Sequence, residues 1–329
     1  MLTYRVSGRM DLLDVFKPNV ARLRERKDWG GLVRALEYRR DAAVRKGAVK
    51  ALGEAADPAL LDPLVKALGD PDDGVRYEAV EALVRLKDPR AVEPLAASLR
   101  DPDSDVRFAA AWSLGEIRDQ KAVGPLVAAL GDESWRVRTE TLLALSKIGD
   151  PGVLPAVVTA LGDEYWRVRT EAARALGLLA DPAAEERLIA ALGDENWRVR
   201  REVVRALGSM RSERSMEPLV RAIGDPDENV RREAASILES MGPAAIGPLA
   251  KALQGEAKEG RREAARALGR IRDPGAIESL IPLLQDEDPH VRDEALIALG
   301  RMGGKGVKPL IRAMKEKGFS DLSGKGGGP

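Results

Sequence analysis

The sequence predicts an all-α solenoid, in which short helix pairs follow one another along the chain and stack side by side. A Val-Arg dipeptide recurs in register at eight positions, 30 or 31 residues apart, and a ninth unit has Gly260-Arg261 in its place. Each unit contains two segments with helical spacing of apolar residues. Aromatic residues make up only 4% of the 329 residues, as expected for a thin core in which Ala and Leu let helices approach closely. The repeated valines are Val44, Val75, Val106, Val137, Val168, Val199, Val230 and Val291.

Residues 88–117 show how one unit is built. Asp88-Pro89 is typical of a helix start, because Asp caps the free N–H groups and Pro is tolerated at the first helical position. Asp103 caps a second helix, whose apolar face begins at Val106. An amphipathic pair of this length cannot bury both faces alone, so copies must stack. In other units a glycine is expected to end the first helix, at Gly69, Gly131, Gly162, Gly193 and Gly224.

The two ends of the chain differ from the repeats. We expect residues 1–27 to form an N-terminal segment with a capping helix, and residues 28–302 to form about nine repeats. Residues 303–317 read as a half-repeat that caps the C-terminal end. The last residues, 318–329, are rich in Gly and are predicted to be disordered.

The unit resembles the HEAT-like repeats of the phycobilisome-lyase type, which are common in archaea and bacteria. The matching motif is D-P-x-A-V-x-P-L-V-x-A-L-x-D-x-x-x-x-V-R-x-x-A-x-x-A-L-G, and residues 88–115, 119–146 and 150–177 fit it well. The resemblance covers residues 28–316. It implies a right-handed solenoid of HEAT-like helix pairs, and it does not single out one activity.

Seven units carry an Asp six residues before the repeated Arg. The resemblance implies that these residues form a hydrogen-bonded ladder along the stack, in which charge-assisted bonds satisfy buried turn groups. Repeat 1 has Arg39 in place of the Asp and repeat 8 has Gly255, which predicts weaker joints at both. The pairs are Asp70/Arg76, Asp101/Arg107, Asp132/Arg138, Asp163/Arg169, Asp194/Arg200, Asp225/Arg231 and Asp286/Arg292.

The composition excludes several kinds of chemistry. The chain has no Cys and one His, so disulfides, thiolate metal sites, Fe–S clusters and Cys nucleophiles are impossible. A catalytic triad would need His290, on which no acid or nucleophile pattern converges. Deoxyhypusine hydroxylases share the HEAT-like repeat but need several His-Glu pairs for two irons, so that activity is excluded. Phycobilin lyases also share the repeat, and a lyase-type or chaperone-type subunit stays open. We predict no catalytic residues, no metal and no cofactor.

Location is inferred from what the chain lacks. Residues 1–10 contain no apolar core of a secretory signal, and no apolar run reaches the length of a membrane span. Together with the absence of Cys, this favours a cytoplasmic protein without a membrane partner. Many charged residues and few Asn and Gln are typical of thermophilic proteins. The oligomeric state is not predicted.

A stripe of Trp and Arg marks the second helices. At 100° per residue, positions −2, −1, +2, +3, +6 and +10 from the repeated Val face away from the core. Three consecutive units carry Trp-Arg at −2 and −1, a composition typical of interface hot spots. Alternatively, each Trp packs over the seam between repeats, and each Arg pairs with Glu140, Glu171 or Glu202. The predicted partner-binding residues are Phe108, Trp112, Trp135, Arg136, Trp166, Arg167, Trp197 and Arg198.

An arginine row on the same face offers a second hypothesis. Clustered arginines suggest nucleic acid, but position +3 is Glu in seven units and should neutralise the row. The middle of the chain is also acidic, because 51–300 carries a net charge of −12 within a neutral whole. Phosphate binding needs uncompensated positive charge. We therefore favour a non-catalytic scaffold that binds a protein or peptide on the concave face. The alternative nucleic-acid row is Arg174, Arg201, Arg205, Arg232, Arg262 and Arg266.

Overall fold

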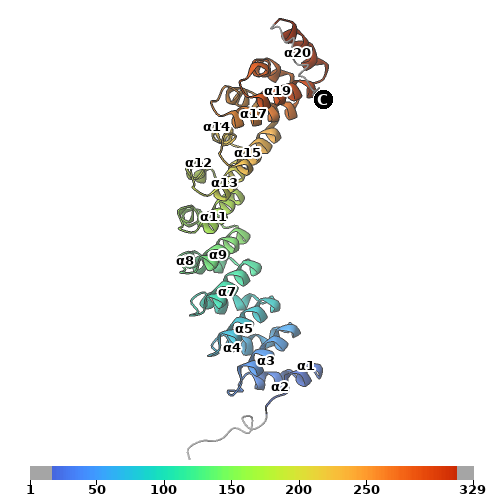
Figure 1. The fold of residues 1–329 in the computed structure, drawn as a ribbon. Coiled ribbons are helices and arrows are strands. Elements are labelled where there is room, and N and C mark those ends of the chain that lie inside the picture. Colours follow the sequence, from blue (N-terminus) through green and yellow to red (C-terminus); the bar gives the residue numbers. More distant parts are fainter. Residues whose placement is uncertain (1–16, 317–329) are drawn as a thin grey trace, which may run out of the picture. The chain divides into compact units, whose positions relative to one another are not determined.

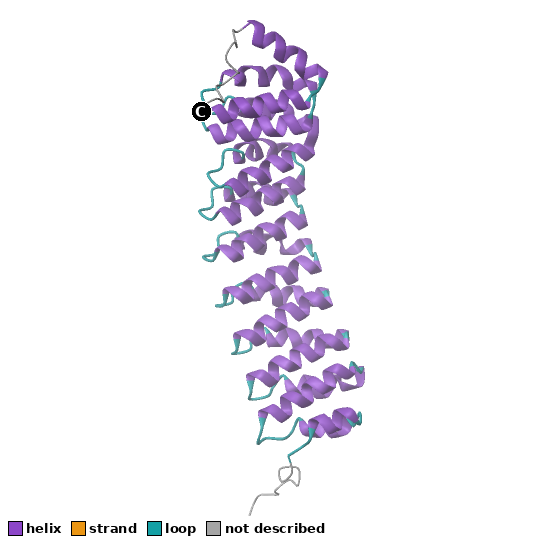
Figure 2. Ribbon diagram, turned by 45° about the vertical axis from the view of Figure 1, so that its right-hand side comes forward, coloured by secondary structure: helices purple, strands orange, loops and turns teal. Residues whose placement is uncertain are grey.

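The computed structural model describes residues 17–316, and within that range the regular structure is helical, with no strand (Figures 1 and 2). Helices follow one another in tandem along the chain, as the repeat predicts. The chain divides into two compact units, one ending at Ala160 and the other beginning at Leu161. The predicted tail 318–329 and most of the segment before α1 lie outside the described residues.

In the first unit, short and long helices alternate. The short first helices α4, α6 and α8 have seven residues, and the long second helices have fourteen. A 3₁₀ turn precedes each of these first helices. The helices are α1 (Val20–Glu25), α2 (Trp29–Ala35), α3 (Ala42–Ala55), α4 (Leu61–Ala67), α5 (Asp73–Leu86), α6 (Val92–Ser98), α7 (Ser104–Ile117), α8 (Val123–Ala129), α9 (Trp135–Ile148) and α10 (Leu154–Ala160).

The second unit shows the same alternation of short and long helices up to α19. Its last helix, α20, begins within the predicted half-repeat 303–317. The helices are α11 (Trp166–Leu179), α12 (Glu185–Ala191), α13 (Trp197–Met210), α14 (Glu213–Ala222), α15 (Glu228–Met241), α16 (Ile246–Ala252), α17 (Lys258–Ile271), α18 (Ile277–Leu280), α19 (Pro289–Arg301) and α20 (Gly304–Glu316).

The helix ends depart from one expectation. The glycines after the first helices do not adopt a left-handed conformation; Gly131, for example, donates its N–H to the Ala128 carbonyl in a 3₁₀-type turn, which any residue can adopt. The left-handed residues instead follow the second helices, and most are not glycine. Arg118, with φ of 58°, donates its N–H to the Leu114 carbonyl. The glycines thus stand at the predicted C′ position, directly after the C-cap residue, as Gly69 follows Leu68 and Gly131 follows Leu130, but without the left-handed conformation.

Neighbouring second helices approach closely along a seam of small residues. A Cβ atom at Gly177 on α11 would lie 2.8 Å from the Cα atom of Ala206 on α13. Glycines at the same repeat position on α3, α7 and α17 meet an alanine of the next second helix in the same way. The glycine of the A-L-G motif therefore sets the distance between repeats, and the core behind it is built from buried Ala, Leu and Val.

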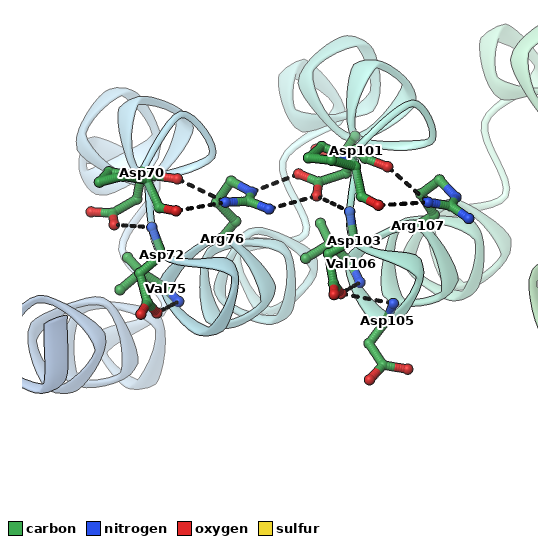
Figure 3. A network of polar contacts seen from close by, with 12 residues as sticks. Asp70, Asp72, Val75, Arg76, Asp101, Asp103, Asp105, Val106 and Arg107 are labelled. Atoms are coloured by element: carbon green, nitrogen blue, oxygen red, sulfur yellow. Dashed lines mark hydrogen bonds and ion pairs between the residues drawn. The ribbon is translucent and has the colours of Figure 1, made fainter.

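Arginine and aspartate connect successive repeats (Figure 3). Arg76 donates from Nη1 to the backbone oxygen of Asp70, 3.0 Å away, in its own repeat. Its Nε and Nη2 donate to the carboxylate of Asp101 in the next repeat, at 2.7 and 2.8 Å. That carboxylate also accepts from the backbone N–H of Asp103. The same bidentate contact joins Arg45–Asp70, Arg107–Asp132, Arg169–Asp194, Arg200–Asp225 and Arg261–Asp286.

The seven Asp and Arg pairs at the six-residue spacing make the turn contact of their own repeat. In all seven, the Arg donates to the backbone oxygen of the Asp rather than to its carboxylate. Arg138 illustrates the difference, since it donates from Nη1 to the backbone oxygen of Asp132 at 2.8 Å. The Asp132 carboxylate instead binds Nε of Arg107, in the preceding repeat, at 2.7 Å. The spacing of six residues therefore describes a turn contact, and the carboxylate serves the neighbouring repeat.

Arg292 makes the turn contact of the other ladder arginines. Arg292 donates from Nη1 to the backbone oxygens of Asp286 and Glu287, at 2.8 and 3.1 Å. The residue 25 positions ahead is Lys317 rather than an Asp. Within residues 17–316, Arg292 accordingly makes the turn contact of its own repeat and no ion pair with a following one.

The ion pairs of the ladder are largely withdrawn from solvent. The side chains of Arg76 and Asp101 are 11% and 8% exposed. Burial by itself would raise the pKa of Asp101, but hydrogen bonds from Arg76 and from the Asp103 N–H bring that pKa below its usual value. The hydrogen bond to Asp101 in turn raises the pKa of Arg76. Both groups are therefore held in their charged forms.

Of the two repeats without the Asp, repeat 1 keeps its contacts, whereas the joint that precedes repeat 8 loses a hydrogen bond. Arg45 in repeat 1 donates to the backbone oxygens of Tyr38 and Arg39 and still binds Asp70. The contact within a repeat uses a backbone oxygen, which Arg39 supplies as well as an Asp would, so this contact is kept. At Gly255 the missing carboxylate affects the preceding repeat. Arg231 is 8% exposed, and its buried Nε has no hydrogen-bond partner.

Restoring that carboxylate should stabilise the second unit. We expect Gly255→Asp to raise the free energy of unfolding by about 1.5–3 kcal/mol, because hydrogen bonds to charged groups contribute about that much. The Gly255 backbone already occupies the ladder position, since its carbonyl accepts from Arg261 Nη1 at 3.1 Å. Urea unfolding measures the change, and Gly255→Ala is the control without a carboxylate. A gain equal in both variants would contradict the explanation.

Candidate partner-binding surface

The eight predicted partner-binding residues divide between the two units. Phe108 and Trp112 lie on α7, with Trp135 and Arg136 on α9 in the first unit. Trp166 and Arg167 lie on α11, with Trp197 and Arg198 on α13 in the second. The Trp-Arg pairs open their helices, since Trp135, Trp166 and Trp197 are each the first helical residue.

In the second unit, arginines lie over the tryptophan rings. The Arg167 guanidinium carbon is 4.6 Å from the centre of the Trp166 ring. The Arg198 carbon is 5.1 Å from the Trp166 ring and 4.5 Å from the Trp197 ring, so it connects the two helices. Arg201 lies 5.3 Å from the Trp197 ring. At these distances cation–π attraction holds the groups together. We call these five residues the tryptophan–arginine stack.

The stack differs from a simple exposed tryptophan stripe. Trp166 and Trp197 are half-buried, whereas Arg167 and Arg198 are exposed. The guanidinium groups therefore cover the rings rather than standing at their rim. The alternative pairing of Arg198 with Glu202 is not formed. The Glu202 carboxylate instead lies 3.4 Å from Nη1 of Arg205. Within the part of the chain that the structure describes, Arg198 and Arg201 make no ion pair.

Arg201 was missed as a member of this group, although the sequence offered a signal. It appeared only in the nucleic-acid row, yet it lies four residues after Trp197 and so on the same face of α13. Its Nε is buried and has no hydrogen-bond partner. The stack thus contains a second cation that this part of the chain leaves without an acceptor at that atom.

In the first unit, the arginine of the corresponding group is neutralised by an acid. The Arg136 guanidinium lies 5.3 Å from the Phe108 ring and 3.0 Å from the carboxylate of Asp105. Trp112 and Trp135 are half-buried. Here the positive charge is already paired with an acid of the preceding second helix, which distinguishes this group from the stack.

The arginine row is largely paired with carboxylates. Arg174 binds Glu171 at 2.8 Å, and Arg205 binds Glu233 at 2.8 Å on the next second helix. Arg232 pairs with Glu228, Arg262 with Glu263, and Arg266 with both Glu263 and Glu294. Arg201 alone in this row stacks on a ring without an ion pair among the residues described. The row therefore offers little uncompensated charge to a phosphate backbone.

Three of the seven glutamates at position +3 are buried, contrary to the helical projection, and the other four are half-buried. Glu140, Glu263 and Glu294 are 8%, 1% and 8% exposed. A projection of a single helix ignores its neighbour, and the close seam between second helices covers this position. Burial raises the pKa of Glu140 above its usual value.

Metal ligands and membrane spans were sought among residues 17–316. That range contains no group of three or more His, Cys, Asp or Glu residues arranged to hold a metal ion. His290 is exposed at the start of α19, and its backbone N–H donates to Asp288. Of the helices described, none has the length and apolar character needed to cross a membrane.

Comparison with protein families identifies the repeat. The family profile described as HEAT repeats matches residues 31–113, 92–177, 154–239, 185–259 and 246–321. The chain is a HEAT repeat protein. The predicted family and the predicted α-solenoid fold are both confirmed. A search of curated proteins gives no match to this HEAT repeat protein.

Solved structures share the fold. The HEAT repeat protein matches Kap95p from a complex with RanGDP with a TM-score of 0.60 and 15% identity, over 91% of this chain and 49% of that chain. It matches importin beta with a TM-score of 0.56 and 16% identity, over 96% and 53%. It thus spans about half the length of these two. The CpcE–CpcF complex of phycocyanin lyase from Nostoc sp. PCC7120 matches with a TM-score of 0.42 and 25% identity, over 68% and 94%.

Proposed function

We propose that this HEAT repeat protein is a non-catalytic scaffold that binds a protein or peptide on the face lined by its second helices. The observation that carries the proposal is the tryptophan–arginine stack. Its two indole rings are fixed on neighbouring helices, and an exposed guanidinium lies close to both. Trp and Arg are the residue types that contribute most to interface energies. A preorganised group of this kind loses little side-chain entropy when a partner binds.

The fold is compatible with this role. Kap95p, which shares the solenoid fold, is found in a complex with RanGDP. The charge pattern supports a protein partner over a nucleic acid, because the arginines beside the stack are paired with glutamates. Because these arginines are neutralised, the uncompensated positive charge is confined to the stack and does not extend along the row, as binding to a phosphate backbone would require.

The proposal is tested by removing the rings. We expect Trp166→Ala combined with Trp197→Ala to reduce capture of the partner by about tenfold or more, as loss of hot-spot residues does. Tagged full-length chain serves as bait in a lysate of the source organism, and mass spectrometry identifies what is retained. Circular dichroism should show unchanged helix content.

A matched control separates this surface from general effects of losing a tryptophan. Trp29 is also half-buried and also begins a helix, but it lies on α2, a first helix of the other unit. Trp29→Ala should retain full capture. If the double variant captures the same partner as the unchanged chain, the site assignment is wrong.

A further inference from the structure

We propose that the part of the partner that contacts the stack is a short acidic segment, whose carboxylates pair with Arg198 and Arg201. This inference rests on the proposed function and specifies the chemistry of the partner. It concerns residues of α11 and α13 alone, all within the second unit.

The first argument is that Arg198 and Arg201 lack a carboxylate partner, whereas neighbouring arginines have one. The neighbouring Arg174 and Arg205 are matched by Glu171 and Glu233. In contrast, Arg198 and Arg201 have no ion pair with any residue of the described range, although both lie over the same Trp197 ring. Two adjacent guanidinium groups without acids repel each other. A ligand that brings negative charge would relieve this repulsion.

The second argument is the orientation of the donors. A guanidinium that lies over an aromatic ring keeps its N–H groups in its own plane, at the edge, where they remain free to donate. A carboxylate accepts two such parallel hydrogen bonds. Arg198 is exposed and lies close to two rings at once, so a partner can reach its N–H groups at little entropic loss.

The third argument favours a peptide over a nucleic acid. Single strands bind by stacking bases on exposed aromatic faces, but Arg167 and Arg198 lie over the Trp166 ring, and Arg198 and Arg201 over the Trp197 ring. A long polyanion would also meet the acidic middle of the chain, since residues 51–300 carry a net charge of −12. A few carboxylates on a short segment avoid that repulsion.

The experiment uses the full chain and an array of short synthetic peptides that range from strongly acidic to strongly basic, with an oligothymidylate as a further probe. Acidic peptides should be retained, and their glutamine-substituted twins should bind about tenfold more weakly. Arg198→Gln combined with Arg201→Gln should remove the preference for acidic peptides. Arg198→Lys should retain part of it, because the charge stays while the planar donor edge is lost.

The matched control is Arg187→Gln combined with Arg214→Gln. It removes the same charge from exposed arginines of the first helices α12 and α14, and it should leave acidic binding unchanged. Equal loss in both double variants would show that only net charge matters and would overturn the inference. So would tighter binding of the oligothymidylate than of any acidic peptide, or retention of acidic peptides by the Arg198/Arg201 variant.

Failure of the inference differs from failure of the proposed function. If neutral or basic peptides bind and depend on Trp166 and Trp197 but not on the two arginines, the surface is a docking site and the acidic partner is wrong. If the tryptophan variant captures its partner normally, the docking site itself is wrong.

Discussion

Replacing Asp101 by alanine is expected to lower the free energy of unfolding by about 3–5 kcal/mol, the range observed when one member of a buried ion pair is removed. Arg76 would keep its charge while losing both bonds to the carboxylate. Its side chain is 11% exposed, so water replaces those bonds poorly. The N–H of Asp103 would lose its acceptor as well.

Urea unfolding followed by circular dichroism measures this loss, and hydrogen exchange should place it in α5 and α7. The control is Asp105→Ala, which removes an exposed acid four residues further on, in the first turn of α7. Asp105 and its partner Arg136 are 63% and 54% exposed, and exposed pairs contribute about 0.2–1 kcal/mol. If the two variants lose equal stability, burial of the ladder is not what makes Asp101 important.

Adding one methyl group at Gly177 is expected to destabilise the second unit by about 1–3 kcal/mol, as overpacking of a core does. The new Cβ atom would lie 2.8 Å from the Cα atom of Ala206. That contact is with backbone, so α11 and α13 must move apart. Thermal and urea unfolding of Gly177→Ala report the change.

Gly247→Ala supplies a control with the opposite expected sign. Gly247 is in helix α16 of the same unit, and nothing lies within 4 Å of a Cβ built there. Alanine is the better helix former, so stability should rise by about 0.5–1 kcal/mol. If Gly177→Ala also stabilises the protein, the close seam does not constrain the spacing of the repeats.

The fold could be predicted because the same sequence pattern recurs at a fixed interval along the chain. An amphipathic helix pair that recurs at a fixed interval has one way to bury its apolar faces, which is to stack on its copies. The role of Gly177 was not predictable in the same way, since it depends on the distance between two helices. The burial of Glu140 has the same origin, because a projection of one helix contains no neighbour.

The candidate surface could be predicted only in part. The interval between Trp166 and Trp197 placed both rings at equivalent positions of adjacent helices. That Arg198 lies over both rings depends on side-chain rotamers and on the neighbouring helix, which the sequence does not encode locally. The weaker joint expected at Arg39 was wrong for a related reason. Arg45 donates to the backbone oxygen of residue 39, which every residue type provides.

The two acceptors of each ladder arginine are synthesised at different times. Each arginine that spans two repeats receives its backbone acceptor from residues already behind it in the chain, whereas its carboxylate lies 25 residues ahead, as for Arg76 and Asp101. During synthesis, a repeat that has just left the ribosome therefore carries a guanidinium whose counter-ion has not yet been made. Such a repeat is completed by the one translated after it, so the most recently made repeat is the least stable part of a growing chain.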